Sequence, residues 1–150
     1  MHLETEHYED LVRTFHARLK TIPETRAAEK PRDGSWSLKE IVGHLIDSAA
    51  NNHQRFVRLQ EGDLEGFPSY NNENWIRIQH YRKVAWTELI EFWYVYNRML
   101  LFIVKNVDAG SLKNEWTHEG ESRTLEWLIS DYYRHMKWHI DKFNGKLVSA

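Results

Sequence analysis

The sequence contains no cysteine, and this absence excludes several chemistries at once. A disulfide framework, a thiolate nucleophile and a cysteine-ligated metal each require a residue that the chain does not have. Any thiol that takes part in its chemistry would therefore have to arrive as a small molecule. We expect a cytoplasmic protein.

Long apolar runs and an excess of charge of one sign are also missing. No apolar stretch approaches the roughly 20 residues that span a bilayer, so we expect no membrane partner. The 20 Lys and Arg residues nearly balance 22 Asp and Glu, and without a basic run we expect no nucleic-acid partner. The acidic first eleven residues do not resemble a targeting peptide. At 150 residues, the chain is predicted to form a single domain, residues 1–150.

Only three prolines and seven glycines interrupt the chain, and apolar residues recur at helical spacing between them. Four long helices are predicted, over Glu4–Lys20, Ser37–Gln60, Val84–Asn106 and Thr124–Phe143. Polar connections are expected over Glu61–Asn74 and Asp108–Arg123, with a short helical turn at Glu73–His80. No alternation is strong enough for a central sheet. The predicted fold class is therefore all-α, a four-helix bundle with long loops after helices two and three.

Two histidines near the end of the chain, His135 and His139, are four residues apart and would share one helix face. With nine histidines in 150 residues, chance alone produces such a pair about half the time. Helical projection places His139 about 40° and His135 about 80° from the centre of the apolar stripe, both near the interior. They could bind a metal ion with a third ligand, or be partly buried structural histidines.

His44 is the third histidine of interest, and projection places it about 120° from the apolar stripe of its helix, at the boundary with solvent. Asp131, one turn before His135, could orient that imidazole through a hydrogen bond, as carboxylates often do for metal-bound histidines. An ordinary surface role near the helix N-terminus is an equal alternative for Asp131. Four aromatic residues are candidates to shape a pocket: Trp36, Trp75, Trp116 and Tyr132.

The segment from Pro31 to Ser48 resembles the helix-two signature of the DinB/YfiT-like superfamily. A Trp36-Ser37 pair is followed by Glu40 and then by His44-Leu45, and the His135-x-x-x-His139 pair is similar to the family's second hallmark. The similarity extends over nearly the whole chain. It implies a four-helix bundle in which three histidines hold a divalent metal, with His44, His135 and His139 at the matching positions.

The resemblance also implies a function. Relatives use a low-molecular-weight thiol to attack an electrophilic small molecule, often in detoxification, and metal-hydroxide hydrolysis is the other enzymatic possibility. One divalent ion per chain is expected, with nickel or zinc favoured over iron or manganese for three neutral imidazoles. The alternative is a non-enzymatic, dimeric stress or binding protein with a structural or vestigial metal. Under either hypothesis we expect a homodimer and two long loops that set specificity.

Overall fold

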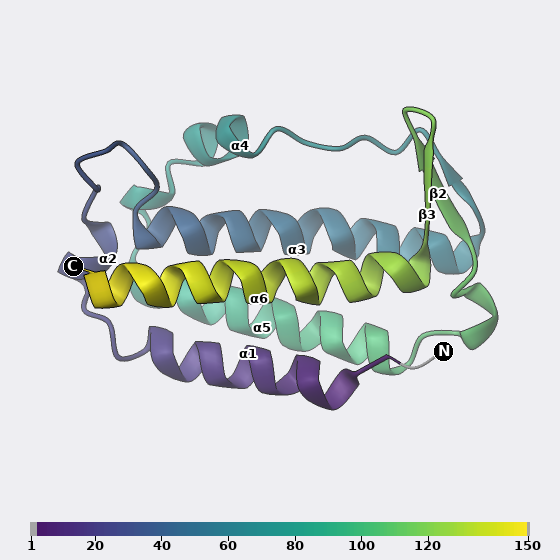
Figure 1. Ribbon diagram of the computed structural model, residues 1–150, viewed down its shortest axis with the longest axis horizontal. Helices are drawn as coiled ribbons and strands as arrows, with labels where there is room; N and C mark the ends of the chain where they lie inside the picture. The colour runs from purple at the N-terminus through teal and green to yellow at the C-terminus, as the bar shows by residue number, and fades with distance from the viewer. Residues whose placement is uncertain (1–2, 150) are drawn as a thin grey trace.

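The computed structural model describes residues 3–149, and its framework is a bundle of four long helices (Figure 1). These are α1 (Thr5–Leu19), α3 (Leu38–Glu61), α5 (Trp86–Lys105) and α6 (Leu125–Ser149). The colour gradient shows that α3 and α5 run in one direction while α1 and α6 run in the other. The prediction of an all-α bundle is confirmed. No helix within residues 3–149 has the length and apolarity that crossing a membrane would require.

The helix ends follow local chemistry. At the start of α3, the Ser37 hydroxyl accepts from the Glu40 amide at 3.2 Å, and the Glu40 carboxylate accepts from the Ser37 amide at 2.9 Å. This is the capping box that the sequence predicts. It fixes the first residue of α3, and hence the direction in which each later side chain of that helix points.

Aromatic side chains fill the interior between the helices. Tyr8 of α1 stacks on Tyr133 of α6 with ring centroids 4.0 Å apart, and Phe15 meets Trp93 and Phe143 edge-on at 5.2 and 5.1 Å. Such pairs add to the free energy gained from burying apolar area. Much of the high aromatic content is therefore explained by the core.

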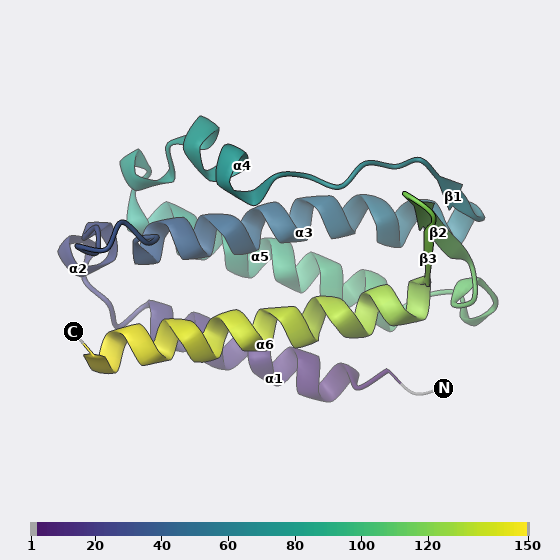
Figure 2. The same ribbon diagram turned by 45° about the horizontal axis from the view of Figure 1, so that its top comes forward.

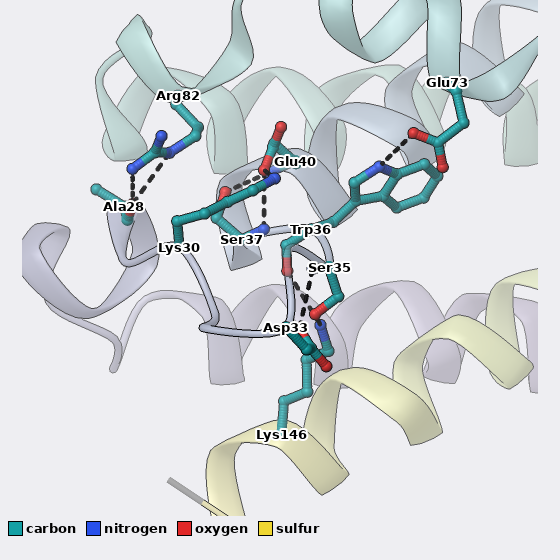
Figure 3. Close-up of polar contacts among 10 residues, drawn as sticks. All are labelled: Ala28, Lys30, Asp33, Ser35, Trp36, Ser37, Glu40, Glu73, Arg82 and Lys146. Atoms are coloured by element: carbon teal, nitrogen blue, oxygen red, sulfur yellow. Dashed lines mark hydrogen bonds and ion pairs between the residues drawn. The ribbon is translucent and has the colours of Figure 1, made fainter.

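Three features differ from the sequence prediction, two of them in helices and the third in the connection after α5. A short helix, α2 (Glu24–Ala28), precedes α3, where none was expected. The predicted end of the last helix at Phe143 is wrong, because α6 continues through Gly145 to Ser149. There the Lys146 ammonium donates to the Trp36 carbonyl at 3.0 Å (Figure 3). Arg26 donates to the Lys146 carbonyl at 3.0 Å, so this last turn is held by tertiary contacts.

The connection after α5 is not an irregular loop. It contains a 3-10 turn (Ala109–Ser111) and the hairpin β2 (Glu115–His118) and β3 (Glu121–Thr124). The two-residue strand β1 (Leu64–Glu65) pairs with β2 in parallel, so the two long connections meet in one small sheet at the end of the bundle.

The first long connection lies over α3 (Figure 2). It carries α4 (Asn72–Gln79) and a 3-10 turn (Tyr81–Lys83) before α5 begins. The ring of Tyr81 packs against the backbone of Gly43 in α3. This segment, with the hairpin, supplies the walls around the candidate site.

Candidate metal centre

The structure brings together the three histidines that the sequence singles out. The Nε2 atom of His139 lies 3.1 Å from Nε2 of His44 and 3.1 Å from Nε2 of His135. The three candidate ligand atoms all lie within 4.8 Å of one another. Two helices far apart in the sequence therefore direct three nitrogens toward one point.

These contacts are not explained by hydrogen bonding alone. A neutral imidazole nitrogen carries either one hydrogen or one lone pair, so Nε2 of His139 cannot make good hydrogen bonds to both neighbours. Two nitrogens bound to one zinc-like ion at 2.0–2.1 Å would lie roughly 2.8–3.4 Å apart, depending on the coordination angle. The observed 3.1 Å spacings fall within that range. The three residues fit a divalent metal ion that keeps further coordination positions open.

Electrostatics favour the neutral, metal-binding form of these side chains. Burial, reinforced by the neighbouring histidines, lowers the pKa of His44 to about 4 and that of His139 to about 3. Burial also lowers the pKa of His135, although the charge of Asp131 opposes this shift. All three imidazoles are thus neutral near pH 7, as metal ligation requires.

His44 is 1% exposed, so the boundary position obtained from helical projection is wrong. Its ring is covered by Trp36, whose centroid lies 5.0 Å away, and its Nδ1 has no hydrogen-bond partner among the described residues. The projection assumed that only one stripe of α3 is buried. In the structure, nearly every position from Leu38 to Ala49 is buried.

On one side the centre opens into a cleft of about 650 Å³, which we call the indole cleft. It is lined by His139 and two indoles, Trp36 and Trp138, together with Arg77 and Lys142. The Trp36 indole donates to Glu73 at 3.3 Å, which links the start of α3 to α4 (Figure 3). Trp138, 52% exposed, meets the His139 ring edge-on at 4.8 Å.

On the other side lies a second pocket of about 370 Å³, which we call the hairpin pocket. It is lined by His44 and His135, by α3 residues that include Arg55, and by Trp116 of the hairpin. Of the four aromatic candidates, Trp36 therefore lines the indole cleft, while Trp116 and Tyr132 line the hairpin pocket. The expectation for Trp75 is wrong, because it lines neither and faces a third pocket beside Tyr81.

Of the two alternatives for Asp131, the hydrogen bond to His135 is not formed. The Asp131 carboxylate forms an ion pair with Arg134 and lines the hairpin pocket. Other histidines also have structural partners: His16 contacts Glu91 at 2.8 Å, and Nδ1 of His53 lies 2.8 Å from the hydroxyl of Tyr96. Sequence analysis did not identify Arg55 or Trp138.

The fold and the three converging imidazoles define a helical bundle with a candidate metal site. The DinB superfamily matches residues 7–140, and the chain belongs to this family. A candidate metal-dependent hydrolase of Halalkalibacterium halodurans is 21% identical over 135 residues, which cover 89% of this chain and 78% of the relative.

Among solved structures, the chain is similar to YfiT from Bacillus subtilis, described as a probable metal-dependent hydrolase with an unusual four-helix bundle topology. The TM-score is 0.79 at 18% identity, with 96% of this chain and 87% of YfiT covered. At this identity the likeness confirms the fold. The family assigned from the sequence is confirmed as well.

Proposed function

We propose that this protein is a metal-dependent enzyme in which His44, His135 and His139 hold one divalent ion, and that it transfers a low-molecular-weight thiol to an electrophilic small molecule. One observation carries the proposal: the three converging imidazoles line two separate pockets, His139 the indole cleft and His44 and His135 the hairpin pocket. A transfer reaction needs two reactants that reach one centre, and the two pockets provide an approach for each. Because the chain has no cysteine, the thiol must be a reactant.

The bound ion would supply Lewis-acid chemistry, which lowers the pKa of a coordinated thiol or water so that the nucleophilic form is available at neutral pH. The chain's own residues hold the reactants around it. Trp36 and Trp138 offer flat apolar surfaces in the indole cleft. Nickel or zinc is the ion we propose, since both bind nitrogen ligands more tightly than manganese or iron.

Hydrolysis by a metal-held hydroxide is the second candidate, and the names of the two relatives favour it. The two reactions differ in one requirement, because hydrolysis proceeds without added thiol. Within residues 3–149, the centre contains no carboxylate that accepts a hydrogen bond from any of the three histidines. Asp131 and Glu121 nevertheless line the hairpin pocket and could act on a water molecule there, so the activity assay decides between the two reactions.

The test begins with metal content. Untagged wild-type protein incubated with nickel or zinc should retain about one ion per chain, and His139→Ala should lose it while the helical circular dichroism signal is preserved. His7→Ala, at an exposed position on α1, is the control and should retain the ion. Full metal retention by His139→Ala would disprove the ligand assignment.

Activity then separates the two reactions. The metal-loaded protein should accelerate the attack of a small thiol on chlorodinitrobenzene, and it should leave nitrophenyl acetate intact when no thiol is present. Ester hydrolysis without thiol would favour the hydrolase. Inactivity in both assays, across a panel of thiols and electrophiles, would favour a non-enzymatic binding protein.

A further inference from the structure

The hairpin pocket contains a buried positive charge that neither the fold nor the metal site explains. Arg55 of α3 is 6% exposed, and within residues 3–149 no carboxylate lies within 4 Å of its guanidinium. Burying a charge without an ionic partner is costly, and buried arginines are normally paired with a carboxylate or phosphate. An anionic partner is therefore missing from the protein itself.

The protein contacts of Arg55 hold the side chain in place but leave much of its donor capacity unused. Nη2 donates to the Pro68 carbonyl at 3.4 Å, and the guanidinium lies 4.3 Å from the ring of Trp116 and 5.8 Å from that of Phe67. Its Nε–H is buried without a hydrogen-bond partner. A guanidinium has five donors in a planar fork that matches a carboxylate.

The other charges of the pocket are already compensated. Glu121 pairs with Arg123, two residues further along β3, at 3.7 Å, and Asp131 pairs with Arg134. Among the lining side chains Arg55 and Arg123 balance Glu121 and Asp131, but within residues 3–149 neither carboxylate lies within 4 Å of the Arg55 guanidinium, so the charge of Arg55 has no ionic partner. A neutral ligand would leave that charge unpaired, whereas an anion would pair with it.

Arg55 lies on the same face of α3 as the candidate metal ligand His44. Residues 44, 48, 52 and 55 follow one another at steps of four, four and three, and all four line the hairpin pocket. Eleven residues of helix place the two Cα atoms about 16 Å apart along the axis. Because helical side chains lean toward the N-terminus, both side chains shift in the same direction, and the gap between their ends is roughly 10–16 Å, depending on how far the longer Arg55 side chain extends.

Ser48 and Asn52 occupy the intermediate positions of this stripe. Asn52 donates to the Ser48 carbonyl at 2.9 Å and approaches its hydroxyl at 3.4 Å, so the floor of the pocket between the two ends is polar. On the opposite wall, the Trp116 indole donates to the Phe67 carbonyl at 2.9 Å, which fixes the ring that stacks on Arg55. The anion-binding end of the pocket is therefore preorganised.

From this arrangement we propose that Arg55 binds the carboxylate of an extended small molecule whose reacting end lies at the three histidines. The ligand class is a carboxylate whose reactive group lies roughly 10–16 Å away, at least the length of an extended tripeptide. This inference rests on the proposed function for the identity of the reacting end, but the carboxylate site itself does not. Arg55 would then determine which reactant occupies the hairpin pocket.

Two pairs of probes test the assignment. The first pair is a mercapto-octanoate and a mercapto-octanol, each with its thiol at the far end of an eight-carbon chain, measured by calorimetry on nickel-loaded protein. The second pair is octanoate and octanol, without a thiol, measured on metal-free protein. We expect wild type to bind the acid of each pair at least tenfold more tightly than the alcohol.

Arg55→Met should abolish this preference without changing the bound nickel, and Arg55→Lys should retain part of it. Arg58→Met is the matched control, because Arg58 is exposed, lies one turn further along α3 and also contacts Phe67, at 5.4 Å, yet lies outside the pocket. The control should keep the full preference. A purely structural Arg55 would lower stability in Arg55→Met while leaving the acid-to-alcohol ratio unchanged.

The proposal would be overturned if wild type bound acid and alcohol equally, or bound neither detectably. It would also be overturned if the preference for the acid persisted in Arg55→Met. Failure of the proposed function is distinguishable from this result. If the metal site is misassigned, nickel does not bind, but the octanoate preference of metal-free protein and its loss in Arg55→Met remain. If only Arg55 is misassigned, nickel binding remains and both preferences are absent.

Discussion

At Gly43, the addition of a single methyl group by Gly43→Ala should destabilise the folded protein. Gly43 precedes His44 in the second turn of α3, where alanine would ordinarily stabilise a helix by about 1 kcal/mol relative to glycine. Here a Cβ atom would lie 2.2 Å from Cδ2 and 2.5 Å from Cγ of Tyr81. Carbon atoms in good contact are about 3.5–4.0 Å apart. The ring must therefore move by more than 1 Å.

The displaced ring also carries a buried hydrogen bond. The Tyr81 hydroxyl donates to Oδ1 of Asp47 at 2.6 Å, and Asp47 is 2% exposed. Overpacking costs about 1–3 kcal/mol, and a lost hydrogen bond to a buried charged group costs about 1.5–3 kcal/mol. After the gain in helix propensity is subtracted, Gly43→Ala should lower the free energy of unfolding by roughly 1.5–5 kcal/mol.

The assay is urea denaturation followed by tryptophan fluorescence, with the slope against urea compared between variants. Tyr81→Phe isolates the hydroxyl, and Gly43→Ala in a Tyr81→Leu background should destabilise by at least about 1 kcal/mol less than in wild type. A Gly43→Ala variant as stable as wild type, or more stable, would show that helix propensity prevails and that the packing of Tyr81 on α3 is looser than described.

Two further predictions concern protonation and assembly. The folded protein holds His44 neutral down to about pH 4, whereas the unfolded chain protonates it near pH 6.5, so the stability of metal-free protein should fall on acidification through that interval. The free energy of unfolding should change with pH by up to about 1.4 kcal/mol per pH unit more than it does in His44→Ala. Equal pH slopes for the two proteins, measured by denaturation, would refute this prediction. The homodimer expected from the sequence should form through an exposed apolar face of α5 made by Phe92, Val95, Met99 and Phe102. The first turn of α5 is acidic and its last turn is basic, which favours antiparallel pairing with a second copy. Met99→Glu should therefore be monomeric by analytical ultracentrifugation, and a monomeric wild type would exclude the interface.

The parts of the fold that sequence predicts are those with local signals. The capping box at Ser37 fixes the start of α3, and helical periodicity finds the four long helices. The hairpin was not predicted, because its two-residue turn places Glu119 and Gly120 at positive φ, and Glu-Gly is not among the strong turn signals. The continuation of α6 past Gly145 depends on contacts with residues more than 100 positions away, which no local pattern encodes.

The candidate site likewise contains residues that the sequence reveals and residues whose role depends on the folded structure. His135 and His139 are evident from their spacing, and the resemblance adds His44, whose burial depends on Trp36 and on the covering connection. Arg55 could have been noticed, since 44, 48, 52 and 55 share one helix face. The lack of a carboxylate partner for Arg55, which is what gives the residue its significance, becomes evident only from the folded structure.

The long connection between α3 and α5 links the stability of the bundle to the chemistry of the site. Its path over α3 depends on the close approach of Tyr81 to Gly43, one residue from His44. The same segment supplies Pro68, which accepts from Arg55, and Tyr70, which lines the hairpin pocket. Loss of the Gly43 contact should therefore weaken the carboxylate preference at Arg55 even though Arg55 is twelve positions further along the helix. If the connection only joined two helices, Gly43→Ala would bind the acid and alcohol probes with the same affinity ratio as wild type. A lower ratio in Gly43→Ala would show that the connection positions the residues of the hairpin pocket.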